Sequence, residues 1–132
     1  MTARFSRPAA LAAFAGTLAV PIVLATGALA HHGWEWAEEK QTNLEGVIRE
    51  IYIGPPHPTL KVETAGDGIW QIDLANPRQT TNAGFVEGSA RPGNKIQILG
   101  NRSAKKEQKL MKAVRITVEG KDFLLYPERI QK

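Results

Sequence analysis

The stretch IWQIDLANPRQTTNAG, residues 69–84, decides the fold, because the period of its apolar residues changes within it. Its first six residues alternate between apolar and polar, which is typical of a strand with one buried face. Asn76 and Pro77 then predict a helix start, since Asn caps helices and Pro fits the first helical position. We therefore expect a strand over 69–74 and a short helix over 77–82.

On both sides of this stretch, other segments alternate between apolar and polar residues and are separated by Gly, Pro and Asn. They predict strands over 44–54, 60–64, 94–100, 110–118 and 122–126. The order β-β-β-α-β-β, with an added C-terminal hairpin strand, favours an all-β domain over 44–132 built as an OB-fold-like five-stranded barrel. Gly46 fits a long first strand that must bend to join both sides of the barrel. The alternative is an open antiparallel sheet or small sandwich with one helix.

The first 30 residues predict a secretory signal peptide. Arg4 and Arg7 give a positive start, a long uncharged run rich in Ala, Leu and Val follows, and the stretch ends in Ala28-Leu29-Ala30. We therefore expect export to the periplasm and cleavage after Ala30. The alternative is an uncleaved leader that anchors the protein in a membrane, since the apolar run is long enough to span a bilayer.

The composition argues against several classes of function. Loss of Arg4 and Arg7 with the leader lowers the formal net charge from +4 to +2, which gives no reason to expect nucleic-acid binding. Without cysteine there is no thiol catalysis, Cys-ligated zinc or iron–sulfur chemistry. The sequence has no phosphate-binding glycine loop and no HExxH, and Ser89 and Ser103 lack a nearby His–Asp context. We expect a binding or accessory protein of unknown ligand rather than an enzyme.

Three motifs together resemble an uncharacterised family of small exported bacterial proteins that is catalogued as a domain of unknown function. They are HHGW at the expected mature start, Pro-His-Pro after the first strand, and RITVEGKDFLLYP near the end. The turn reads Gly-Pro-Pro-His-Pro here, where the form associated with the family is Asn-Pro-His-Pro, and His57 is kept. The resemblance implies export and a small β domain, and brings no established activity or catalytic residue.

The three histidines of the chain, His31, His32 and His57, form the sharpest chemical pattern. Cleavage after Ala30 would give His31 an α-amine beside its imidazole, and a second imidazole from His57 or His32 would complete a T-shaped copper-binding brace. A predicted extended arm over 31–43 reaches His57 only by folding back along the barrel. Two alternatives stay open: a local chelate of His31 and His32, and histidines of a tail and a turn that bind nothing.

Two tryptophans and a basic loop suggest a second kind of surface. Trp34 and Trp36 would face the same side of an extended arm, either as a staple onto the barrel or as a stacking platform for a sugar. The loop over 101–109 carries Arg102, Lys105, Lys106 and Lys109. In an OB-type barrel this loop and the turn that carries His57 flank the ligand face.

This surface gives the alternative function: a module that binds an anionic glycan or a partner protein on the barrel face, with a membrane headgroup as a further anionic ligand. The competing interpretation is that the basic loop is only a solvated loop. A redox enzyme built on the copper site is the remaining hypothesis, and it requires that site first.

Overall fold

The computed structural model describes residues 2–4, 10, 12–13, 15–16 and 33–132. Most of the leader predicted over 1–30 lies outside these residues, as do His31 and His32. No helix within the described residues has the length and apolar character needed to cross a membrane.

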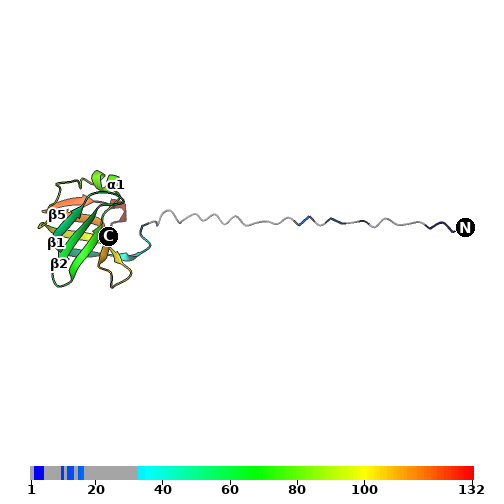
Figure 1. Ribbon diagram of the computed structural model, residues 1–132, viewed down its shortest axis with the longest axis horizontal. Helices are drawn as coiled ribbons and strands as arrows, with labels where there is room; N and C mark the ends of the chain where they lie inside the picture. The colour runs from blue at the N-terminus through cyan, green and yellow to red at the C-terminus, as the bar shows by residue number, and fades with distance from the viewer. Residues whose placement is uncertain (1, 5–9, 11, 14, 17–32) are drawn as a thin grey trace.

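Six strands and one short helix make up the domain (Figure 1). In chain order they are β1 (Ala37–Tyr52), β2 (Thr59–Thr64), β3 (Gly68–Asp73), α1 (Pro77–Asn82), β4 (Lys95–Ser103), β5 (Leu110–Val118) and β6 (Lys121–Leu124), followed by a 3₁₀ turn at Pro127–Arg129. The fold class predicted from the sequence is confirmed: strands dominate, and the one α-helix of the described residues lies between β3 and β4.

The strands close into a ring. The sheet order is β3-β2-β1-β4-β5-β6, and β5 also pairs with β3 in parallel, through Gln71–Leu110, Ile72–Met111 and Asp73–Lys112. The C-terminal half of β5 pairs with β6 instead, from Arg115–Leu124 to Val118–Lys121. Because register shifts interrupt the β1–β2, β1–β4 and β4–β5 ladders, the ring is irregular rather than a clean barrel. Because β3 pairs with β5, the sheet is closed, which excludes the alternative of an open antiparallel sheet.

β1 bends at Gly46, where it leaves one partner and joins another. Its residues up to Val47 pair with β4, and those from Val47 onward pair with β2. A Cβ on Gly46 would lie 2.3 Å from the carbonyl oxygen of Glu63, so only glycine allows β2 to approach this closely. Gly100 of β4 has the same role against the carbonyl oxygen of Lys112, also at 2.3 Å.

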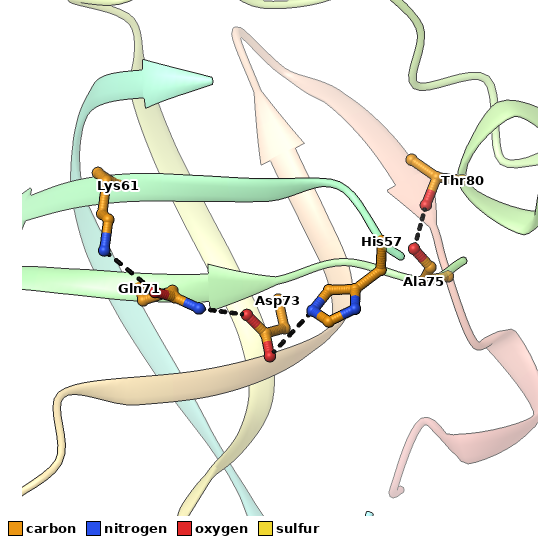
Figure 2. Close-up of polar contacts among 6 residues, drawn as sticks. All are labelled: His57, Lys61, Gln71, Asp73, Ala75 and Thr80. Carbon is orange, nitrogen blue, oxygen red and sulfur yellow. Dashed lines mark hydrogen bonds and ion pairs between the residues drawn. The ribbon is translucent and has the colours of Figure 1, made fainter. Parts of the chain in front are cut away.

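The inward faces of the strands fill the ring with aliphatic side chains, and α1 covers one end of it (Figure 1). The helix begins as predicted: the Asn76 side chain accepts a hydrogen bond from the Gln79 amide at 2.8 Å. Thr80 is buried, and its hydroxyl donates to the carbonyl of Ala75 at 2.9 Å (Figure 2). Phe85 after the helix packs edge-to-face on Phe123, which joins this end of the ring to β6.

The first strand is longer than we expected. It begins at Ala37 rather than at Leu44, so residues 37–43 belong to the sheet and not to an extended arm. Their sequence, AEEKQTN, is mostly polar, and each of these residues is exposed or half-buried. Their free edge is covered by the C-terminal segment, since Gln41 and Gln131 exchange hydrogen bonds between side chain and backbone. β4 likewise runs on to Ser103, and β6 ends at Leu124 rather than at Tyr126.

Substituting Gly46→Ala should lower the free energy of unfolding by about 1–3 kcal/mol, because its Cβ would meet backbone that cannot rotate away. Gly54→Ala is the matched control and should lower the free energy of unfolding less than Gly46→Ala does. Its Cβ would meet mainly the side chain of half-exposed Tyr52, which can move. Urea unfolding of both variants checks this, and a Gly46→Ala protein as stable as wild type would show that β1 and β2 can separate at the bend.

Candidate functional site

His57 lies in the turn between β1 and β2, which is tied down on both sides. The Tyr52 hydroxyl donates to the carbonyl of Pro55 at 2.7 Å, and the amide of Leu74 donates to the carbonyl of Pro58 at 2.9 Å. Pro58 is buried, whereas about a third of the His57 side chain is exposed. The turn therefore holds a solvent-accessible imidazole at the end of β3.

Asp73 is the polar partner of this imidazole (Figure 2). His57 Nε2 lies 3.3 Å from Asp73 Oδ2, and Asp73 Oδ1 accepts a hydrogen bond from Gln71 Nε2 at 2.9 Å. Lys61 Nζ in turn donates to Gln71 Oε1 at 3.0 Å. Asp73 is only 8% exposed, so its carboxylate depends on these partners rather than on water. A line of four polar side chains thus runs across the outer face of β2 and β3 to His57.

Lys112 reaches this site from β5, across the parallel pairing of β3 with β5 that closes the ring, which we call the seam. It is the register partner of Asp73 on β5. Burial lowers the pKa of Lys112, the negative charge of Asp73 partly restores it, and the positive charge of Arg129 lowers it further. Burial also raises the pKa of the Tyr126 phenol. Lys112 Nζ lies 5.4 Å from the centroid of the Trp34 ring and 5.9 Å from that of Tyr126.

The start of the described domain lies on this seam. Residues 33–36 form a turn rather than an extended arm. The prediction that Trp34 and Trp36 face the same side of an extended arm is therefore wrong. The Trp34 ring meets the Tyr126 ring edge-to-face at 4.9 Å, and the Arg129 guanidinium lies 4.2 Å from its centroid. A Cβ built on Gly33 would be 3.6 Å from Lys112 Nζ. Trp36 is half-buried, and its carbonyl accepts from the Ala104 amide at 2.8 Å.

The basic loop lies at the other end of β3. The Arg102 guanidinium is 4.3 Å from the centroid of the buried Trp70 ring, and both Arg102 and Lys109 approach Asp67, at 4.0 and 3.8 Å. Lys105 and Lys106 are exposed. Asp67 and Asp73 are six residues apart, or about 20 Å along a strand. The loop therefore contacts the β2–β3 turn. We had expected it to lie near the turn that carries His57, and that prediction is wrong.

Of the three predicted metal ligands, the structure places His57 alone, because His31 and His32 lie outside the described residues. No group of three or more His, Asp or Glu side chains among the described residues could hold a metal ion. Sequence reasoning missed Asp73 and Lys112. Strand alternation placed Asp73 on an outward face, and nothing local in the sequence shows that ring closure covers that face.

Lys112→Met should change how stability depends on pH. Because burial lowers the pKa of Lys112 below 10.5 in the folded state, the unfolded state binds more protons just below that pH. This group therefore makes wild-type stability rise as pH rises toward 10.5. The stability of Lys112→Met relative to wild type should therefore fall as pH rises toward 10.5, as measured by urea unfolding. A constant difference would mean that Lys112 keeps its solution pKa.

Comparison with known proteins gives a family but no activity. The model of a family described as "Family of unknown function (DUF6152)" matches residues 20–111. The match includes HHGW and the Pro-His-Pro turn and ends before RITVEGKDFLLYP. No curated protein matches the chain. These findings indicate no enzyme family.

One solved structure that resembles the chain comes from a crystal structure of TiaS in complex with an isoleucine transfer RNA and ATP. It shares 17% sequence identity over 60% of this chain, with a TM-score of 0.47. The present chain spans 18% of that one, and a likeness at this level bears on neither ligand nor activity. The family model, by contrast, covers more than half of the chain, so the protein belongs to DUF6152, a family of unknown function.

Proposed function

We propose that this protein is a small exported binding protein that holds Cu(II) between its mature N-terminus and His57. The leader pattern of residues 1–30 supports export to the periplasm and cleavage after Ala30. Such cleavage leaves the α-amine and the imidazole of His31 at the chain end. Nitrogen donors of this kind suit Cu(II), which also heads the affinity order of divalent first-row metals.

The position of Gly33 is the observation that carries the proposal. Gly33 lies beside Lys112 Nζ, Lys112 is the register partner of Asp73, and the Asp73 carboxylate contacts His57. An extended residue spans about 3.3–3.6 Å, so the two residues before Gly33 add a reach of about 7 Å before any side chain is counted. The course of residues 33–36 therefore supports the fold-back that a brace with His57 requires.

The pair of His57 and Asp73 suits a metal ligand. An ionised carboxylate only accepts hydrogen bonds, so it favours the tautomer of His57 with its proton on Nε2. The lone pair then lies on Nδ1, which has no polar partner among the described residues. A carboxylate in this position fixes the orientation of a ligating imidazole. Gln71 holds the carboxylate in turn, at 2.9 Å.

Titration of Cu(II) against a competing chelator tests the proposal on protein that begins at His31. Adding one glycine before His31 moves the amine away from the imidazole, and His57→Ala removes the distant ligand. Each change should weaken Cu(II) binding by at least about tenfold, equivalent to about 1.4 kcal/mol. Asp73→Asn should weaken it by about ten- to a hundredfold, through the orientation of the ring.

His32→Ala is the matched control, because the brace with His57 does not use that imidazole. Thermal unfolding of each variant establishes that the ring is intact. If His57→Ala binds as tightly as wild type while His32→Ala and the added glycine weaken binding, the site is the local chelate of His31 and His32, and the brace is wrong. If none of the changes matters, the histidines are not the copper site.

A further inference from the structure

A pocket lies away from His57, between the first half of β1 and the β4–β5 loop. Its volume is about 350 Å³, within the range of small-molecule pockets. Lys40 and Thr42 line it from β1, Asp67 from the β2–β3 turn, and Arg102, Lys106 and Lys109 from the end of β4 and the loop that follows. Separate parts of the chain thus place cationic side chains around one hollow.

Within the described part of the chain, Arg102 is held in place by its contact with the Trp70 ring rather than by hydrogen bonds from its own donors. Its guanidinium lies 4.3 Å from the centroid of the Trp70 ring, and Trp70 Nε1 donates to Asp67 at 3.1 Å. The closest approach of Arg102 to Asp67 is 4.0 Å, beyond hydrogen-bond distance. Its Nε is buried and has no partner among the described residues. A positioned guanidinium with free donors is suited to a carboxylate or another oxyanion.

The other groups at the pocket favour a ligand that carries hydroxyls as well as negative charge. Four cationic side chains line it against the two carboxylates of Glu38 and Asp67, so positive charge is in excess. The buried Thr42 hydroxyl has no partner among the described residues, and Gln108 uses its carbonyl oxygen to accept from Ser103. Because Trp70 is only 4% exposed and its face is covered by Arg102, the pocket offers no aromatic platform for stacking.

We infer that this pocket binds an acidic saccharide, with the carboxylate of a uronic acid at Arg102 and Lys106. The sugar hydroxyls can then bond to the uncharged donors and to Glu38. Recognition depends on charge and hydrogen bonds rather than on stacking. The inference does not rest on the copper proposal, because the pocket lies at the Asp67 end of β3 and His57 lies at the Asp73 end.

Binding of a galacturonic-acid trisaccharide, measured by calorimetry at low salt, tests the inference. Lys106→Gln should weaken binding by at least about tenfold, the lower end of what a hydrogen bond to a charged group contributes. Lys105→Gln is the matched control: Lys105 is adjacent, exposed and equally charged, and it does not line the pocket. It should change affinity by less than about twofold, since exposed charges act weakly through solvent.

Arg102→Lys keeps the positive charge and loses the planar set of donors, so it should also weaken binding. A neutral galactose trisaccharide should not bind. Equal losses in Lys105→Gln and Lys106→Gln would indicate diffuse electrostatic attraction and overturn the assignment of the pocket. Equal binding of the neutral sugar, or no binding of the acidic one, would overturn the ligand class.

Discussion

The parallel pairing of β3 with β5 is the contact on which the rest of the structure depends. It joins only three residue pairs, yet it turns a row of antiparallel strands into a ring and gives the outer edge of β3 a partner. Gly46 and Gly100 support the curvature of the ring, because they let neighbouring backbones come closer than any side chain allows. The same pairing places Asp73 and Lys112 next to each other, with Asp73 buried and Lys112 half-buried.

The two ends of the domain meet over this seam. Trp34, before β1, contacts Tyr126 and Arg129, after β6, while Gln131 binds the edge of β1 at Gln41. These contacts cover polar strand edges that would otherwise be open to association. They also bring the start of the domain to the face that carries His57, which is the geometric condition for the metal site proposed above.

The sequence predicted β3 and β5 well, because their apolar periodicity is strong, and it predicted α1 from the Asn76 cap and Pro77. It failed at the start of β1, because AEEKQTN has no apolar face and is held by pairing with β4 and with the C-terminal segment. It predicted His57 as a candidate ligand from its rigid turn. It could not predict Asp73 as the partner of His57, because their contact depends on how that turn folds over the end of β3.

By itself, then, the sequence determined the order of strands and helix and the bend at Gly46, since these depend on local periodicity and backbone freedom, and it predicts a leader over residues 1–30. Only the tertiary structure decided that the basic loop lies against Asp67 rather than near His57, and that the turn at residues 33–36 folds back onto the seam. Both depend on which strands become neighbours when the ring closes. That choice is made by contacts between residues far apart in the chain, which no local pattern encodes.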